Sequence, residues 1–440
     1  MKDDEKLLDD LEEKLANENK VPKGYKLIIL FLCILIILLV GGIIFIFFYF
    51  QHLIKKNENN KKEEDEKSKE DYLLEINGFK EKWYDIYGNR TINISYLEND
   101  VVPNTYKKNG LNYLEELGEV NEGKDYTKHD VNVYDLYIPY SSLKRKHKHN
   151  GIILFVHGGG FENNTKEETE CFAVRFAKLG FITANIEYSN CLDIYKEKSV
   201  YRILDEITAC IKSIKKELIS QGFDGDKLEM ALYGISAGGQ LILTYAFSNK
   251  AETIPIKFIM NSVGIASINS TYWYKPAIPN ITLNNIESIH DIEIAKQNKS
   301  IIPIDRSFVL GIINAMSGKK LTKEEVKNLL INGEINIEDK NYEKIYNFAK
   351  FASPIEIIGK KDLVPMLCLY GGNDDLIGVN HFSLLKQAYI DNGHEDKIEL
   401  VYMKYGGHER FHHGTDHDII AMKKMHAKMV EYGKKYFILD

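Results

Sequence analysis

Residues 228–239 have the sequence LEMALYGISAGG, an apolar run that ends in a serine flanked by glycines. The run predicts a buried strand, and the G-x-S-x-G pattern around Ser236 predicts a sharp turn from that strand into a helix. Because such a turn strains the backbone at the serine, the residues two before and two after it must be small. Gly234 and Gly238 meet this need. The stretch therefore predicts a nucleophilic serine above a sheet, with the backbone N–H of Ala237 beside it.

A second glycine-rich segment, HGGG at residues 157–160, follows the apolar run 152–156, which also predicts a buried strand. Glycine allows the backbone to approach a ligand that a side chain would crowd. The N–H groups of Gly159 and Gly160, together with that of Ala237, can therefore donate to an oxygen that becomes negative during acyl transfer. A G-x-S-x-G pattern alone is a weak signal, but the two segments together predict the oxyanion hole and nucleophile of a serine hydrolase.

The two other groups of a catalytic triad follow later predicted strands. The run 365–370 predicts a buried parallel strand, and Asp374 stands in the loop after it. The run 398–403 predicts the next strand, and His408 follows it through a Gly-Gly turn. Both side chains are expected at the carboxyl end of the sheet, beside Ser236. The order serine, aspartate, histidine is the chain order of the α/β-hydrolase triad.

Neighbouring residues offer alternatives for two of these roles. Asp375 could face the same histidine, but the spacing from the preceding glycine favours Asp374. Only His408 follows a strand directly through a Gly-Gly turn, which favours it as the base. Its rivals in the sequence are His394, His412 and His413.

The histidines do not predict a metal site. Gly414 interrupts any helix that would align His413 with His417, and the sequence has no H-E-x-x-H pattern. His157 is expected to brace the HGGG loop and not to act as a base. We therefore expect neither a metal nor a cofactor.

These motifs resemble those of a known family. HGGG-F, G-x-S-A-G-G, the loop G-x-x-D-x-x-I and the final GGH are similar to the α/β-hydrolase-fold serine esterases of the hormone-sensitive-lipase-like and carboxylesterase group. The run 133–139 resembles the strand that these enzymes place before the oxyanion loop. The likeness spans roughly residues 125–265 and 350–435. It implies an α/β fold with a mostly parallel sheet flanked by helices.

The chain differs from the lipase-like branch at two places. The residue before the nucleophile is usually acidic in that branch, and here it is Ile235. The segment after the next strand is usually Tyr-Arg-Leu, whereas residues 187–190 have the sequence EYSN. Both differences bear on the subfamily and so on the substrate.

A long insertion, about residues 266–360, separates the two parts of the likeness. Helical periodicity at 305–317, 322–331 and 342–351 predicts three helices within it. In this fold such an insertion lies over the active-site end of the sheet as a lid or acyl pocket. Trp273 could line that pocket, although such aromatics more often belong to the core.

The N-terminal part predicts a membrane anchor. Residues 27–50 carry no charge, and at roughly 1.5 Å per residue they extend about 36 Å, enough to span a bilayer core. Residues 1–26 form a short tail before this transmembrane helix. Residues 51–71 form a charged tether rich in lysine and glutamate, and residues 72–440 form the α/β-hydrolase domain.

The orientation of the anchor is inferred from the architecture, because lysines flank the span equally. A short tail, one span and a large C-terminal domain suggest a single-pass protein with its hydrolase domain extracytoplasmic or lumenal. Asn-x-Ser/Thr sites agree with this side of the membrane, although an asparagine-rich chain also contains such sites by chance. They are Asn89, Asn93, Asn163, Asn269, Asn280 and Asn298.

Composition excludes some partners. A net charge of −7 provides no basic surface for nucleic acid, and 44% hydrophobic residues suffice for one large core. Cys33 lies in the predicted span and Cys368 in a predicted core strand. Cys171, Cys191 and Cys210 could supply one disulfide or could all be buried free thiols.

Together the residues predict a membrane-anchored serine hydrolase that cleaves carboxylic esters through an acyl-enzyme, with a small-molecule or lipid ester as substrate. An arylformamidase or another amidase on the same triad is an alternative, because the fold hosts both chemistries. A non-catalytic scaffold or adhesion protein of this fold is a third hypothesis. Such proteins usually lose a triad member, and none is missing here.

Overall fold

The whole chain divides into two compact units, Met1–Glu70 and Asp71–Asp440. The computed structural model describes part of this chain. The described residues all belong to the second unit. They are 88–95, 107–108, 111–112, 132–162, 164–189, 200–248, 254–277, 288–317, 328–331, 334–359, 363–408 and 416–438. The predicted tail, transmembrane helix and tether at residues 1–71 lie outside them. No helix among the described residues is long and apolar enough to cross a membrane.

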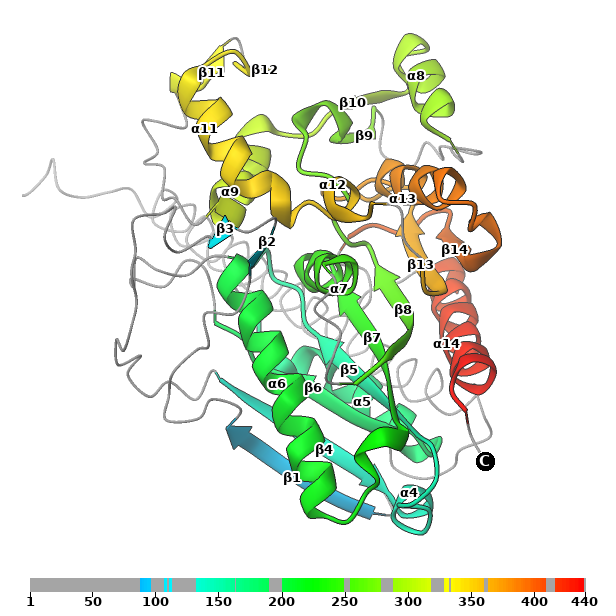
Figure 1. Cartoon of the computed structure of the whole chain (residues 1–440). Helices are drawn as coiled ribbons and strands as arrows, with labels where there is room; N and C mark the ends of the chain where they lie inside the picture. The colour runs from blue at the N-terminus through cyan, green and yellow to red at the C-terminus, as the bar shows by residue number, and fades with distance from the viewer. Residues whose placement is uncertain are drawn as a thin grey trace, which may run out of the picture. The chain divides into compact units, whose positions relative to one another are not determined.

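An eight-stranded sheet in the order β1-β4-β6-β5-β7-β8-β13-β14 forms the centre of this unit (Figure 1). The strands are β1 Gly88–Ser95, β4 Val133–Pro139, β5 Asn150–Val156, β6 Ile182–Ile186, β7 Leu228–Ile235, β8 Ile256–Ser262, β13 Met366–Gly371 and β14 Ile398–Met403. The pairs from β6 to β14 are parallel, whereas β1–β4 and β4–β6 are antiparallel. Parallel strands bring their carboxyl ends to one edge, and this edge carries the site. A separate small pair is formed by β2 Lys107–Lys108 and β3 Leu111–Asn112.

Helices cover both faces of the sheet, which explains why β5 and β7 are buried along their whole length. Figure 1 shows α6 and α7 in front of the sheet and α5 behind it. On the α5 side, Phe172 and Phe176 pack against His426 of α14. The elements are α4 Tyr140–Leu143, η2 Lys166–Thr169, α5 Glu170–Lys178, α6 Val200–Ser220, η3 Gly225–Lys227, α7 Ala237–Phe247, α13 Asn380–Asp391, η6 Glu395–Lys397 and α14 Asp416–Tyr436. The predicted α/β sheet with flanking helices is confirmed.

The predicted insertion lies between β8 and β13. It contains η4 Ser270–Tyr272, β9 Tyr274–Pro276, α8 Ile289–Gln297, β10 Ile301–Pro303, α9 Arg306–Ser317, β11 Leu330–Ile331, β12 Glu334–Ile335, α11 Lys340–Ala349, η5 Lys350–Ala352 and α12 Pro354–Ile357. Its end is tied to α7, because the carbonyl of Ala352 accepts hydrogen bonds from the side chains of Gln240 and Thr244. The insertion therefore packs against the helix that follows the predicted nucleophile.

Two of the three helices predicted in the insertion are confirmed as α9 and as α11 with η5. The prediction at 322–331 is wrong at its end, because Leu330–Ile331 pairs with Glu334–Ile335 as two antiparallel strands. The sequence between these strands is Asn-Gly, the dipeptide most favourable for a two-residue hairpin. The remainder of that prediction, residues 322–327, lies outside the described part of the chain.

Trp273 belongs to the core of the insertion. Its side chain is fully buried against Phe308 and His381, and its indole N–H donates to the carbonyl of Ser267 at 2.9 Å. The core interpretation of this residue is thus confirmed.

Candidate active site

The turn between β7 and α7 places Ser236 in a backbone conformation of positive φ, with φ 54° and ψ −118°. This conformation is strained for a residue with a side chain. The flanking glycines permit the turn. A Cβ atom on Gly234 would lie 2.3 Å from the carbonyl oxygen of Gly238, and one on Gly238 would lie 2.3 Å from the carbonyl oxygens of Val156 and His157. The prediction that both positions must be small is confirmed.

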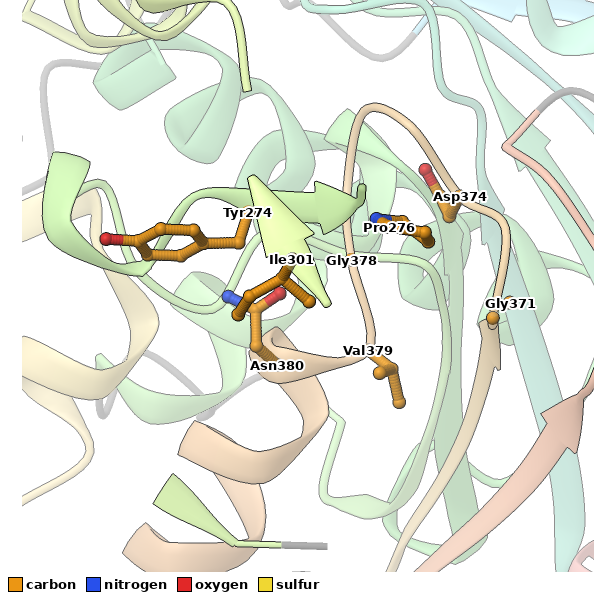
Figure 2. Close-up of a pocket in the computed structure, with 9 residues that line it drawn as sticks. Tyr274, Pro276, Ile301, Gly371, Asp374, Gly378, Val379 and Asn380 are labelled. Carbon is orange, nitrogen blue, oxygen red and sulfur yellow. The ribbon is translucent and has the colours of Figure 1, made fainter. Parts of the chain in front are cut away.

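The three predicted triad side chains lie in one line of hydrogen bonds. Ser236 Oγ is 2.8 Å from His408 Nε2, and His408 Nδ1 is 2.9 Å from Asp374 Oδ2 and 3.1 Å from Oδ1. Asp374 is fully buried at the end of β13 (Figure 2). Its Oδ1 atom also accepts the backbone N–H groups of Leu376 and Ile377, at 2.9 and 2.7 Å. The carboxylate is therefore fixed facing the imidazole.

The rival residues lie elsewhere or outside the described residues. Asp375 is exposed. His394 immediately precedes η6, at the amino end of β14 and so at the opposite edge of the sheet. His412 and His413 lie outside the described residues.

Two glycine pairs allow the acid and histidine loops to meet. A Cβ atom on Gly371 would lie 2.3 Å from the carbonyl oxygen of Gly406, and one on Gly372 would lie 2.4 Å from the hydroxyl of Tyr402. Sequence reasoning used these glycines only as turn signals. The Gly-Gly repeat in both loops was the available sign of this close approach.

The HGGG loop packs over the nucleophile turn. Gly159 and Gly160 have φ values of 97° and 62°, which glycine adopts without strain. A Cβ atom on Gly158 would lie 3.3 Å from Cβ of Ser236. The loop that carries Gly159 and Gly160 therefore lies beside Ser236. Ala237, the third predicted oxyanion donor, directly follows Ser236 as the first residue of α7.

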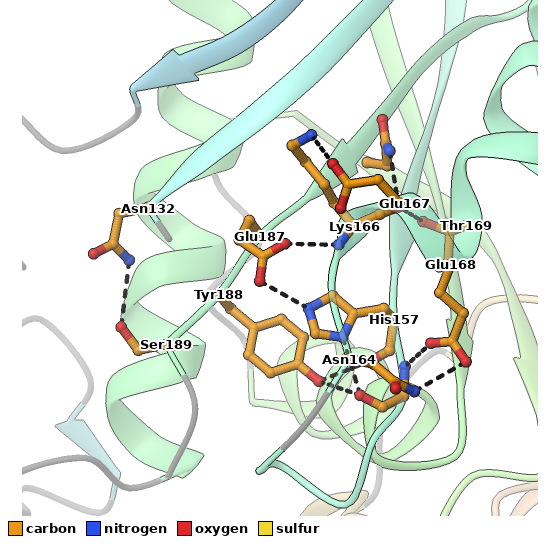
Figure 3. A network of polar contacts seen from close by, with 12 residues as sticks. Asn132, His157, Asn164, Lys166, Glu167, Glu168, Thr169, Glu187, Tyr188 and Ser189 are labelled. Atoms are coloured by element: carbon orange, nitrogen blue, oxygen red, sulfur yellow. Dashed lines mark hydrogen bonds and ion pairs between the residues drawn. The ribbon is translucent and has the colours of Figure 1, made fainter. Parts of the chain in front are cut away.

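A buried polar network supports this loop (Figure 3). The ring of His157 is fully buried and stacks on the ring of Tyr188, with centroids 4.0 Å apart, while its Nδ1 atom lies 3.0 Å from the carbonyl oxygen of Gly158. Burial lowers the pKa of His157 to about 4, so the imidazole is neutral near pH 7. These contacts agree with a bracing role.

Acidic and basic residues that the sequence motifs did not predict complete this network. Glu187 lies 3.8 Å from His157 and accepts the backbone N–H of Lys166 at 2.7 Å; burial raises the pKa of this carboxyl to about 7. The ammonium of Lys166 pairs with Asp135 of β4 at 3.0 Å. The departure of residues 187–190 from the lipase-like pattern was the only signal of this arrangement.

A pocket lies between the insertion and the acid loop (Figure 2). Its lining residues are Tyr274, Pro276, Ile301, Gly371, Gly372, Asp374, Gly378, Val379 and Asn380. The side-chain amide of Asn380 donates to the carbonyl of Tyr272. The insertion thus reaches the loop that carries the acid.

Within the described ranges, no group of three metal-ligating side chains is found. The side chains of His412, His413 and His417 fall outside those ranges. Cys210 and Cys368 are buried free thiols, which rules Cys210 out of the disulfide considered above. Cys33, Cys191 and the side chain of Cys171 lie outside the described residues.

The fold and the site together define an α/β-hydrolase fold in which Ser236 stands at the strand-to-helix turn typical of a nucleophile. The BD-FAE family model matches residues 134–389, which is more than half of the chain. The chain belongs to this family of α/β-hydrolase-type domains. The matched region includes Ser236 and Asp374 and ends before His408.

Several solved structures are similar to the chain. Esterase B from Lactobacillus rhamnosis, inhibited by a C6-C4 SN3 compound, is 14% identical over 70% of this chain and 85% of its own, with a TM-score of 0.46. A truncated carbohydrate esterase from gut microbiota is 14% identical over 80% of this chain and 98% of its own, with a TM-score of 0.49. Butyrate-bound esterase 2 from Thermogutta terrifontis is 17% identical over 72% and 96%, with a TM-score of 0.46. No curated protein matches the chain significantly.

Proposed function

We propose that this protein is a serine esterase that cleaves carboxylic esters through an acyl-enzyme, with Ser236, His408 and Asp374 as its catalytic triad. The observation that carries the proposal is the continuous hydrogen-bonded line from Ser236 Oγ through the imidazole to a buried carboxylate. The strained serine and the glycine loop beside it support the same reading of the site. Membership of an α/β-hydrolase family is consistent with it.

The geometry suggests the order of events. Nε2 of His408 takes the proton of Ser236 as Oγ attacks the ester carbonyl, and Asp374 holds the imidazole and stabilises the imidazolium that forms. The N–H groups of Gly159, Gly160 and Ala237 would stabilise the oxyanion of the tetrahedral intermediate. His408 then gives its proton to the departing alcohol, and water, activated by the same imidazole, releases the acid.

We further propose that the esterase is a single-pass membrane protein, anchored by residues 27–50 with residues 72–440 on the extracytoplasmic or lumenal side. The uncharged length of the segment and the charged tether after it support this placement. Small-molecule and lipid esters are the expected substrates, and a tethered enzyme would meet lipid esters at the bilayer surface.

Covalent labelling tests the catalytic assignment. A fluorophosphonate probe should label the wild-type protein and should not label Ser236→Ala, because the probe reacts only with an activated serine. Ser248→Ala, at the end of the same helix α7, is the matched control and should label like the wild type. Equal labelling of the Ser236 variant would contradict the proposal. For the wild-type protein, rates on p-nitrophenyl esters and on the matching p-nitroanilides separate esterase from amidase activity.

A further inference from the structure

The contacts beneath the HGGG loop act on two consecutive peptide groups (Figure 3). In the peptide between His157 and Gly158, the carbonyl oxygen accepts from the hydroxyl of Tyr188 at 2.9 Å, and the N–H donates to Glu168 Oε2 at 3.1 Å. A trans peptide directs its C=O and N–H to opposite sides. Tyr188 and Glu168 therefore hold this peptide from both sides.

The next peptide joins Gly158 to Gly159. Its carbonyl oxygen lies 3.0 Å from the same Tyr188 hydroxyl, whose one proton the two carbonyls share, and 3.0 Å from Nδ1 of His157. The opposite end of the same peptide is the N–H of Gly159, which must point away from both rings. Gly158 itself lies beside the nucleophile turn, because a Cβ atom on it would lie 3.3 Å from Cβ of Ser236.

The holding groups are themselves fixed. Tyr188 is fully buried, and its ring stacks within 6° of parallel on His157, so its hydroxyl has a defined position. Glu168 is half-buried in η2, and its second carboxylate oxygen accepts from the side chain of Asn164 at 3.1 Å. A run of three glycines has little conformational preference of its own, so such external contacts decide its geometry.

We propose that Tyr188 and Glu168 are positioning residues that fix the direction of the Gly159 N–H as an oxyanion donor. This inference rests on the proposed esterase function. Neither side chain touches the reacting atoms, and each acts through the peptides on either side of Gly158. Since removing an oxyanion donor outright typically costs about 10² to 10³ in kcat, loosening one should cost roughly tenfold or more.

The Tyr188→Phe variant tests the hydroxyl, because it keeps the ring that stacks on His157. Tyr389→Phe is the matched control. Tyr389 lies on helix α13, and its buried hydroxyl donates to the carbonyl of Val364 at 2.8 Å. We would measure kcat and KM on p-nitrophenyl butyrate, inhibition by an aryl trifluoromethyl ketone, and thermal unfolding. The ketone forms a hemiketal with the serine, and its oxyanion reports the donor geometry directly.

We expect kcat of Tyr188→Phe to fall about tenfold or more with KM nearly unchanged, and inhibition by the ketone to weaken by a similar factor. Tyr389→Phe should keep the wild-type kcat, KM and ketone inhibition, even if its melting temperature falls. Glu168→Ala should lower kcat in the same way. Glu168→Gln should restore most of the activity, because its amide oxygen can still accept the Gly158 N–H.

Values of kcat for Tyr188→Phe and Glu168→Ala within twofold of Tyr389→Phe would overturn the inference. A lower kcat with unchanged ketone inhibition would overturn it as well, since that pattern indicates less folded enzyme. If Tyr188→Phe fails to fold, the comparison of Glu168→Ala with Glu168→Gln decides the question. A wild-type protein that neither reacts with fluorophosphonate nor cleaves esters would instead overturn the proposed function, and this inference with it.

Discussion

Asp374 shows how a single residue is prepared for one role. Its carboxylate is withdrawn from solvent, accepts two backbone N–H groups of its own loop and faces Nδ1 of His408. A carboxylate in this position selects the imidazole tautomer that can accept a proton from serine. Asp375, one residue later, is exposed to solvent. Sequence spacing favoured Asp374, and the geometry gives the physical reason for preferring it.

Exchanging each aspartate for asparagine should separate the two neighbours. Asp374→Asn should lower kcat by about 10⁴, because the amide favours the wrong imidazole tautomer. Asp375→Asn should stay within a few-fold of the wild type. Steady-state rates on a p-nitrophenyl ester measure both variants, and the opposite ranking would assign the triad to Asp375.

Glu187 should make stability depend on pH. Burial raises its pKa to about 7 in the folded protein, whereas the unfolded chain releases the same proton near the ordinary value of 4.5. Between these pH values the folded state binds more protons, so this residue's contribution makes stability fall as the pH rises. Glu187→Gln removes the ionisation and can still accept the N–H of Lys166.

The melting temperature of Glu187→Gln minus that of the wild type should therefore increase from pH 5 to pH 8. Glu395→Gln, at an exposed glutamate, is the control and should show no such trend. A pH-independent difference for Glu187→Gln would show that this carboxyl does not titrate in the range.

At the scale of elements, the site depends on close backbone contacts among β5, β7, α7 and the loop after β13. These contacts have glycine at each crossing, as at Gly234, Gly238 and Gly371. The inner strands β5, β7 and β13 were predictable because they are buried along their whole length and so form largely apolar runs. The strand at 133–139, expected from the family resemblance, has the same bounds as β4, and the predicted strand 398–403 has the same bounds as β14.

The elements missed or misjudged lack such a signal. β1 is an edge strand with the polar sequence GNRTINIS, and its pairing with β4 is visible only in the folded chain. The network under the HGGG loop joins Asp135, Lys166 and Glu187, which are distant in sequence. Buried charges of this kind depend on partners that no local pattern specifies. The positions of Ser236, Asp374 and His408, by contrast, followed from strand order.

A pair of alanine substitutions tests the close contacts of the turn. Gly238→Ala should lower the free energy of unfolding by about 2 kcal/mol or more, because its methyl group would overlap two backbone carbonyls. Gly311→Ala is the control: it lies in helix α9 with open space around the position, so it should raise stability by about 0.5–1 kcal/mol. Chemical denaturation measures both, and effects of the same sign would contradict the explanation.

At the scale of the whole molecule, the hydrolase domain is accompanied by the predicted anchor at residues 27–50, which lies outside the described residues. The predicted boundary near residue 71 also lies outside the described residues. Anchor and orientation remain predictions, and they are testable independently of catalysis.

The full protein should stay in the membrane after alkaline carbonate washing, and a protein that starts at Asp71 should be released. In a host that glycosylates, glycosidase should shift the mobility of a lumenal domain. Asn298→Gln should remove one step of that shift, since this asparagine is exposed at the end of α8. Absence of glycosylation, with protease cleavage only from the cytosolic side, would reverse the orientation.

The hydrogen bond between Ser236 and His408 closes a loop of 172 residues, and that between His408 and Asp374 a loop of 34. Contacts over such separations gain nothing from local structure and form only after much chain entropy has been lost. No short fragment holds the three side chains together, since they follow β7, β13 and β14, and the donors follow β5. Turnover by this protein thus reports on the assembly of the five strands that run from the fourth in spatial order to the last.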